Sequence, residues 1–209
     1  MIVGLLVAAG RGRRFDPTGT RSKLEAPIEG TIVALKTAQA LLAGCDRVIA
    51  AVRPDSIVLE DLLRRAGCQI ATVGGEEGMG NSIAHGARAA LLIEPLQALL
   101  VQPADMPWLT AASVRQVAQA VAIAGQLTVV PTYQGKDGHP VRFDRTLVPE
   151  LALLSGERGA REVLRRHPPH RMPLDDAGVV RDLDTPADLE RDTGLAGPAG
   201  PAGPAGPAD

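Results

Sequence analysis

Aromatic residues are scarce in this 209-residue chain, at 2% of the total, and the formal net charge is only −2. A surface that stacks nucleobases needs more aromatic side chains, and a general nucleic-acid-binding protein carries a strong basic excess. No apolar run approaches the roughly 20 residues that are needed to cross a bilayer. The two cysteines, Cys45 and Cys68, are too few for a disulfide-rich framework and are not part of a Cys-x-x-Cys motif. We therefore expect a cytoplasmic protein with neither a nucleic-acid nor a membrane partner.

Apolar segments of two kinds alternate along the chain as far as Pro131. Short continuous runs predict buried strands, and apolar residues at helical spacing predict helices. The expected strands are 2–8, 47–52, 69–73, 96–101 and 127–131, and the expected helices are 31–43, 54–67, 81–92 and 110–124. This alternation predicts an α/β fold with a mainly parallel sheet. Because such sheets bind ligands at the carboxyl ends of their strands, the loops after Ala8, Val73 and Val101 are candidate site loops.

The pattern changes after Pro131. Residues 133–143 are rich in turn formers and then strand-like. Short helices are expected at 147–154 and 160–167, followed by two extended pieces and a last helix that starts at Thr185-Pro186. Nothing here has the composition of a linker, so we predict one domain over residues 1–192. Residues 193–209 contain four Gly-Pro-Ala triplets, too few for a collagen helix, and predict a flexible Gly/Pro/Ala-rich tail.

The loop after Ala8 has the composition of a phosphate-binding loop. From Arg11 to Lys23 it holds five basic residues and one acid, Asp16, and its glycines allow backbone N–H groups to approach an anion closely. No segment has the G-x-x-x-x-G-K-[S/T] pattern of a P-loop, and Phe15 stands where a dinucleotide fingerprint needs its third glycine. The loop therefore indicates a nucleotide site of another kind, with a solvated basic loop as the alternative.

The same loop resembles the signature of the MobA-like nucleotidyltransferases, in Ala8-Ala9-Gly10-x-Gly12-x-Arg14 followed by Lys23. Further resemblances follow in the order of the family's motifs. They are Gly78-Met79-Gly80-Asn81-Ser82-Ile83, Asp105-Met106-Pro107-Trp108, Gly138-His139-Pro140-Val141, Gly159-Ala160-Arg161 and Asp182-Leu183-Asp184-Thr185-Pro186. The last three are similar to the molybdenum cofactor cytidylyltransferase branch. Together the matches span residues 2–189.

The resemblance implies a Rossmann-like three-layer nucleotidyltransferase fold and a reaction that depends on Mg²⁺, for which Mn²⁺ can substitute. In this branch CMP moves from CTP to the terminal phosphate of the molybdenum–pterin cofactor, and pyrophosphate is released. The sequence Ala8-Ala9-Gly10 resembles cytidylyl members, whereas guanylyl members usually have Ala-Gly-Gly, and this contrast indicates CTP as the donor. A molybdoenzyme or its maturation chaperone is the implied protein partner.

The motif residues have chemical properties that suit this reaction. Two anionic phosphates must meet, and a divalent cation held by carboxylate oxygens reduces their repulsion. Asp105, at the end of a predicted strand, is the expected metal ligand, joined by Asp182 or Asp184. Lys23 and Arg14 are expected to hold the triphosphate and to stabilise the charge that develops on pyrophosphate. Lys23, Arg14 and Asp105 are therefore the predicted catalytic residues.

The remaining motif residues are expected to contact the substrates. The predicted nucleotide-binding set consists of Ala8, Ala9, Gly10, Gly12, Arg14, Lys23, Gly80 and Ser82. For His139 the resemblance implies recognition of the acceptor. Structural alternatives exist for the polar residues, since Ser82 and the aspartates are good helix caps and His139 could simply shape the turn before Pro140.

The sequence departs from the family pattern after Arg14. Phe15 and Asp16 replace Met-Gly, and Lys23 follows later than is usual. Two other readings therefore stay open. One is a transferase of the same fold that uses GTP, or a sugar phosphate, isoprenoid phosphate or phospholactate-like acceptor. The other is a non-catalytic protein that delivers the cofactor, against which Asp105 argues, because binding alone does not require a metal carboxylate.

Overall fold

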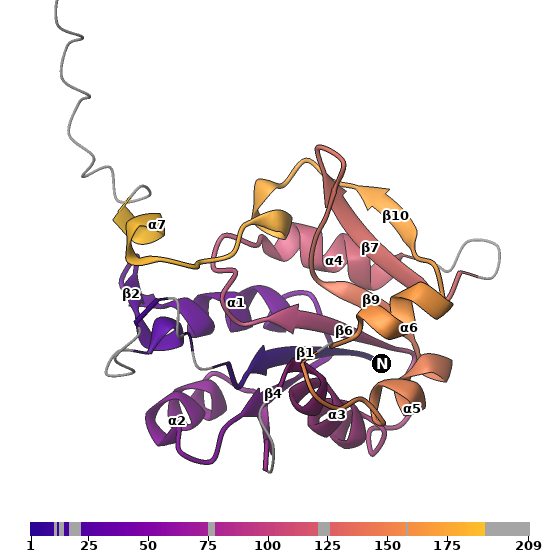
Figure 1. Ribbon diagram of the computed structural model, residues 1–209, viewed down its shortest axis with the longest axis horizontal. Coiled ribbons are helices and arrows are strands. Elements are labelled where there is room, and N and C mark those ends of the chain that lie inside the picture. The colour runs from indigo at the N-terminus through magenta and orange to yellow at the C-terminus, as the bar shows by residue number, and fades with distance from the viewer. Residues whose placement is uncertain are drawn as a thin grey trace, which may run out of the picture.

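The computed structural model describes residues 1–10, 12, 15–16, 22–74, 78–120, 126–157 and 159–190. An eight-stranded sheet lies at its centre, with the order β10-β7-β9-β6-β1-β4-β5 and with β8 paired to β7 (Figure 1). The strands of this sheet are β1 Ile2–Ala8, β4 Arg47–Val52, β5 Gln69–Thr72, β6 Ala98–Pro103, β7 Thr128–Tyr133, β8 Lys136–Asp137, β9 Val141–Asp144 and β10 His170–Pro173. The helices are α1 Val33–Leu42, α2 Ile57–Arg65, α3 Met79–Ala90, α4 Ala111–Gln119, α5 Val148–Leu151, α6 Arg161–Arg166 and α7 Pro186–Glu190.

The sheet is mainly parallel, as the alternation of strands and helices predicted. β1 pairs in parallel with β4 on one side and β6 on the other, and β5 extends the parallel part beyond β4. The interior of these strands is apolar and buried on both faces, which is typical of a parallel sheet covered by helices. β9 runs antiparallel to both β6 and β7. The carboxyl ends of β1 and β6 and the start of β9 therefore meet at one edge.

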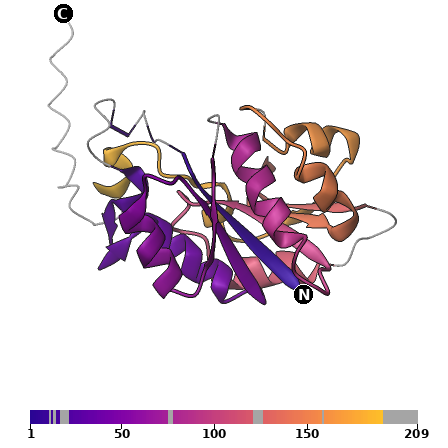
Figure 2. The same cartoon turned by 90° about the horizontal axis from the view of Figure 1, so that it is seen from below.

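Helices cover both faces of the sheet and complete a three-layer α/β fold. Buried residues of α3, α5 and α6 pack on one face, and buried residues of α1, α2 and α4 pack on the other. Figure 2 shows α3 close to the segment that holds α5 and α6, on the opposite side from α1 and α2. α3 approaches the sheet closely because Gly86 has no side chain: a Cβ there would lie 2.1 Å from Cδ1 of Leu5.

Several local expectations were wrong. α3 begins at Met79, two residues before the predicted helix 81–92, because Gly78 has a φ of 141° and ends the preceding loop. A short hairpin forms before α1: β2 Pro27–Ile28 lies in the loop that follows β1, whereas β3 Thr31–Ile32 takes the first two residues of the predicted helix 31–43, so α1 begins at Val33. The segment before Asp184 contains a 3₁₀ turn at Ala177–Val180 in addition to β10.

A third, smaller core lies beside the main ones. Phe15, Ile28, Val33 and Leu183 are buried in it, and Trp108 packs against it. Phe15 is 5% exposed and Leu183 is fully buried, so this core joins the basic loop to the C-terminal segment.

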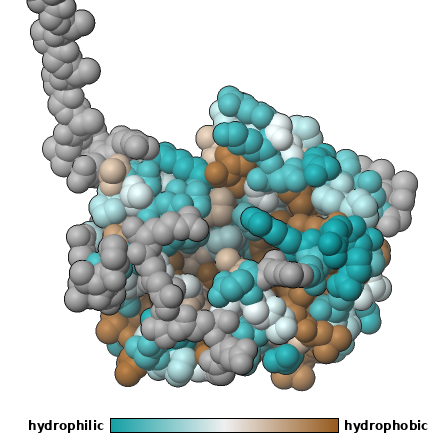
Figure 3. Space-filling model, in the orientation of Figure 1, coloured by the Kyte–Doolittle hydropathy of each residue, from teal (hydrophilic) through white to brown (hydrophobic). Residues whose placement is uncertain are grey.

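The surface in Figure 3 is mixed, and hydrophobic residues show at its lower margin, where Figure 1 places α2 and α3. Exposed apolar side chains on these helices include Ile57, Val58 and Met79. Within the described residues, none of the helices has the length and hydropathy required to span a membrane. The predicted tail, residues 193–209, lies outside the described residues.

Candidate active site

Three residues far apart in the sequence meet at the carboxyl edge of the sheet. Nζ of Lys23 donates a hydrogen bond of 2.6 Å to Oδ2 of Asp105 and lies 3.7 Å from Oδ1 of Asp184. The side chains of Lys23 and Asp105 are 13% and 22% exposed, and that of Asp184 is 41% exposed. A positive charge is thus held between two carboxylates at the mouth of the site.

The sheet and a short turn bring Lys23 and Asp105 together. β1 and β6 are parallel neighbours, and their ends are joined by the N–H of Ala104, which donates to the carbonyl of Val7 at 3.0 Å. Asp105 therefore follows β6 at the level where β1 ends. Lys23 begins a 3₁₀ turn, Lys23–Glu25, whose buried Leu24 fixes it against the core.

Gly12 supports the same lysine from the basic loop. Its φ is +60°, which suits glycine, and a Cβ at Gly12 would come within 3.0 Å of Cβ of Lys23. Ala8 is buried at the end of β1, whereas Gly10 is exposed and has open space where a Cβ would point. Of the predicted phosphate-binding residues, Arg14 lies outside the described residues.

His139 faces the same cluster from the turn just before β9. Burial lowers its pKa, while a backbone hydrogen bond at Val101 and the negative charges of Asp105 and Asp182 oppose this lowering. Its Nδ1 is buried and has no hydrogen-bond partner within the described part of the chain. The imidazole is therefore neutral near pH 7 and retains a polar atom for a ligand.

The segment 174–184, which we call the strap, carries both C-terminal carboxylates to the site. The N–H of His139 donates to the carbonyl of Val179 at 2.7 Å, and the N–H of Leu183 donates to the carbonyl of Asp105 at 2.8 Å. Leu183 is buried, so its two neighbours lie on the opposite side of an extended segment. The two carboxylates then have different partners: Asp182 acts on His139, and Asp184 approaches Lys23.

The loop before α3 is held by protein contacts. The N–H of Gly80 donates to the carbonyl of Gly156 at 2.8 Å, and the hydroxyl of Ser82 donates to the carbonyl of Gly78 at 3.1 Å. A Cβ at Gly80 would lie 2.7 Å from the carbonyl oxygen of Ser155. These contacts occupy the Gly80 N–H and the Ser82 hydroxyl hydrogen, so the predicted role of both residues in nucleotide binding stays a prediction.

Comparison with known proteins now identifies the family. Residues 4–172 match the MobA-like NTP transferase domain. The chain belongs to this family. It is 28% identical to the purine catabolism protein PucB of Bacillus subtilis over 204 residues, which cover 90% of this chain and 94% of PucB.

Solved structures share the MobA-like fold of this chain. The crystal structure of Rv0371c from Mycobacterium tuberculosis superposes with a TM-score of 0.75 at 25% identity, covering 91% of this chain and 95% of that one. A structure of Rv0371c in complex with manganese gives a TM-score of 0.71 at 24% identity, covering 91% of this chain and 96% of that one. The α/β nucleotidyltransferase fold predicted from the sequence is confirmed.

The arrangement suits a divalent cation that is held partly by substrate. Within the described residues, no group of three or more His, Cys, Asp or Glu side chains is arranged to hold a metal ion. Asp105 and Asp184 nevertheless converge on one ammonium group. Mg²⁺ in phosphoryl-transfer sites is usually held by one or two carboxylates together with phosphate oxygens and water. The two aspartates of this MobA-like chain therefore fit such a cation when a nucleotide supplies the other oxygens.

One residue near the site was missed in the sequence. Asp176 begins the 3₁₀ turn of the strap and accepts hydrogen bonds from Thr110 and Ser113 at the start of α4. The only signal was local: an aspartate two residues before Gly178 is typical of a turn. Its tie to α4 comes from tertiary structure and left no motif.

Proposed function

We propose that this chain is a nucleotidyltransferase that moves CMP from CTP to the terminal phosphate of the molybdenum–pterin cofactor and releases pyrophosphate. The observation that carries the proposal is the meeting of Lys23, Asp105 and Asp184 at the carboxyl edge of the sheet. A lysine for the triphosphate and two carboxylates for a cation are what this transfer requires. An oxygen of the acceptor phosphate attacks the α-phosphorus of CTP, and the bond to the pyrophosphate oxygen breaks.

A bound Mg²⁺ or Mn²⁺ would be held by Asp105 and Asp184, and it would neutralise the facing phosphates and position the α-phosphate. Support for a metal includes the manganese complex of a structural relative. Lys23 then exchanges its carboxylate partners for the triphosphate and stabilises the negative charge on the departing pyrophosphate. Arg14 is proposed to share this role from the basic loop.

His139 is proposed to bind the acceptor as a neutral group. Its Nδ1 is buried beside the strap and next to two carboxylates, so it offers a directed hydrogen bond without adding charge. The motif Gly138-His139-Pro140 resembles the molybdenum cofactor branch and supports the choice of acceptor. The relationship to a purine catabolism protein supports a client in purine breakdown, which we propose is a molybdoenzyme or its maturation chaperone.

The proposal is tested by pyrophosphate release. The purified protein is incubated with Mg²⁺, the molybdenum–pterin cofactor and each of the four NTPs in turn, with Asp105→Asn as the inactive control. We expect release with CTP. Release with GTP alone would show that CTP is not the donor. If none of the four NTPs gave pyrophosphate, either the proposed acceptor or the proposed enzymatic activity would be wrong. Binding of labelled CTP and a screen of other phosphate acceptors together distinguish a wrong acceptor from a protein without enzymatic activity.

A further inference from the structure

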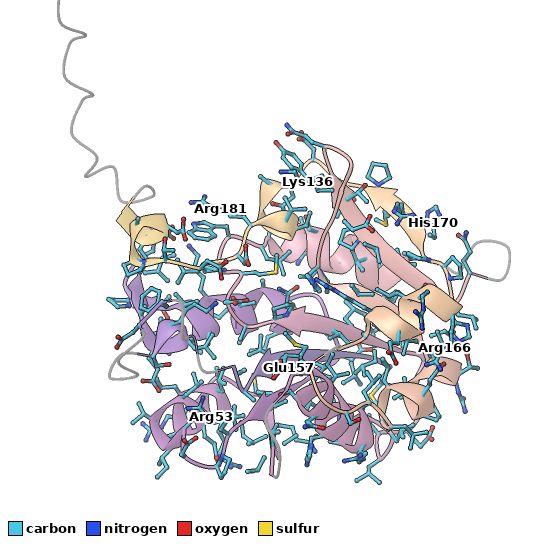
Figure 4. The ribbon with its side chains drawn as sticks, in the orientation of Figure 1. Arg53, Lys136, Glu157, Arg166, His170 and Arg181 are labelled. Carbon is cyan, nitrogen blue, oxygen red and sulfur yellow. The ribbon has the colours of Figure 1, made fainter. Side chains whose placement is uncertain are left out.

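Contacts near both of its ends attach the strap to the rest of the molecule. Near its end, the N–H of Leu183 donates to the carbonyl of Asp105, and next to it Arg181 stacks 3.6 Å above the ring of Trp108. Figure 4 shows Arg181 just before α7, at the edge of the molecule. Near its start, the strap is held by the side chain of Asp176.

The carboxylate of Asp176 accepts hydrogen bonds from several donors. Its Oδ2 accepts from the hydroxyl of Ser113 at 2.6 Å, from the hydroxyl of Thr110 at 2.8 Å and from the N–H of Thr110 at 3.3 Å. Its Oδ1 accepts from the N–H of Gly178 at 2.8 Å. Hydrogen bonds to an ionised acceptor are among the strongest in proteins, and here they come from two different elements.

These donors link the strap to the segment that carries Asp105. Thr110 caps α4 and is separated from Asp105 only by the Met106–Leu109 connection. Gly178 sits directly on this connection, because a Cβ at Gly178 would lie 2.2 Å from the carbonyl oxygen of Trp108. Asp176 therefore joins the two segments that supply the facing carboxylates of the site.

We infer that Asp176 is a positioning residue that sets the distance of Asp184 from Asp105 and so determines how well the site holds its cation. This inference rests on the proposed function, because it assigns the cation to those carboxylates. The carboxylate of Asp176 is engaged by Thr110, Ser113 and Gly178, and the proposed function assigns it neither nucleotide nor metal. Its effect reaches the site through the strap, whose backbone continues from the 3₁₀ turn Ala177–Val180 to the two aspartates.

The first variant is Asp176→Asn, which keeps size and shape but has a single acceptor oxygen, so it cannot accept from both the two hydroxyls and the N–H of Gly178. The second is Ser113→Ala at a buried position, which removes the 2.6 Å hydrogen bond to Asp176 and the 3.1 Å contact between the Ser113 and Thr110 hydroxyls. The control is Asp175→Asn, which removes the same charge from the exposed neighbouring residue. Thermal unfolding of each variant verifies that it is folded.

The main readout is Mn²⁺ affinity in the presence of CTP, measured by electron paramagnetic resonance, with turnover as the second. Loss of an orienting contact behind metal ligands typically costs about 10-fold to 100-fold in metal affinity. We expect Asp176→Asn to weaken Mn²⁺ binding by about 10-fold or more and to lower kcat, while the KM for CTP changes by less than about twofold. Ser113→Ala should give a smaller change in the same direction, Asp175→Asn should match the wild type, and excess Mn²⁺ should restore turnover.

Wild-type Mn²⁺ affinity in a folded Asp176→Asn variant would overturn the inference and leave the proposed function intact. A loss of turnover that excess Mn²⁺ does not restore, with Mn²⁺ affinity unchanged, would overturn it equally. If the wild-type protein itself bound no Mn²⁺ with CTP, the proposed function and the inference would both be wrong.

Discussion

Replacement of Lys23 tests the charge arrangement of the site most directly. The ammonium group lies 2.6 Å from Asp105 and 3.7 Å from Asp184, so under the proposed function it competes with a divalent cation for the same oxygens. Lys23→Met removes the charge and keeps much of the length of the side chain. We expect this variant to bind Mn²⁺ more tightly than the wild type without nucleotide, although its turnover should be lower.

The expected magnitude follows from the separations and exposures. Two unit charges about 4 Å apart attract by about 1 kcal/mol at the dielectric constant of water and by about 4 kcal/mol at an effective value of about 20. The side chains are 13% to 41% exposed, so the free energy by which Lys23 opposes cation binding lies toward the lower of these two values. A gain of about 1.4 kcal/mol corresponds to about a tenfold increase in Mn²⁺ affinity. Loss of the triphosphate contact should lower kcat/KM by more than about tenfold.

The assay is a Mn²⁺ titration followed by electron paramagnetic resonance, without nucleotide and then with CTP. The matched control is Lys36→Met, because Lys36, on α1, also pairs with a carboxylate, but with that of Glu29 rather than with Asp105 or Asp184. The control should bind Mn²⁺ like the wild type. Unchanged or weaker Mn²⁺ binding by Lys23→Met would refute the idea that the lysine and the metal share Asp105 and Asp184.

Four further predictions follow from the same geometry. Asp105→Asn should lower kcat by about 100-fold or more while shifting stability by no more than about 1 kcal/mol, since its ion pair is partly exposed; kinetics and thermal unfolding measure both. Gly138→Ala would place a Cβ 2.3 Å from the carbonyl oxygen of Val179, so it should displace the strap, reduce kcat and cost about 1–3 kcal/mol of stability in denaturant unfolding. Partial burial acts to raise the pKa of Asp176, but the hydrogen bonds from Ser113, Thr110 and Gly178 outweigh it and lower the pKa below its ordinary 3.8. Its stabilisation is therefore present above that value and is lost as the pH falls through the lowered pKa, so Asp176→Asn should show a flatter loss of stability than the wild type below about pH 4. Deletion of residues 193–209 should leave pyrophosphate release unchanged, and a clear loss would show that the tail takes part in activity.

The parallel half of the fold could be predicted because its signals are local. β1 and β4 are short apolar runs buried on both faces, and such runs have few alternatives in a chain of this length. The direction of β9 could not be predicted, because antiparallel pairing with both β6 and β7 depends on how the chain turns through Gly138-His139-Pro140. The start of α3 was missed because the φ of 141° at Gly78 is set by packing against Gly156.

The candidate residues could be named where a motif carries them. Lys23 and Asp105 were both predicted as catalytic residues, and the structure places them in contact although 82 residues separate them, while their roles stay predictions. The sequence left Asp182 and Asp184 equivalent, since both alternate with buried Leu183. Their partners differ because the strap passes between His139 and Lys23. This difference was not predicted from the sequence, because the position of Lys23 is set by a turn whose packing has no sequence pattern of its own.

The charges at the site also dictate how its ligands must influence one another. Without nucleotide, Lys23 neutralises Asp105 and Asp184 and weakens their attraction for a cation. Under the proposed function, a triphosphate would offer Lys23 a stronger anionic partner and supply oxygens to the cation, and it would free the carboxylates as it binds. By linkage, whatever factor the nucleotide adds to metal affinity the metal must add to nucleotide affinity. Under the proposed function the lysine couples the two. The strap that carries Asp184 also accepts from the N–H of His139, so the proposed acceptor residue is connected to the same exchange of charge.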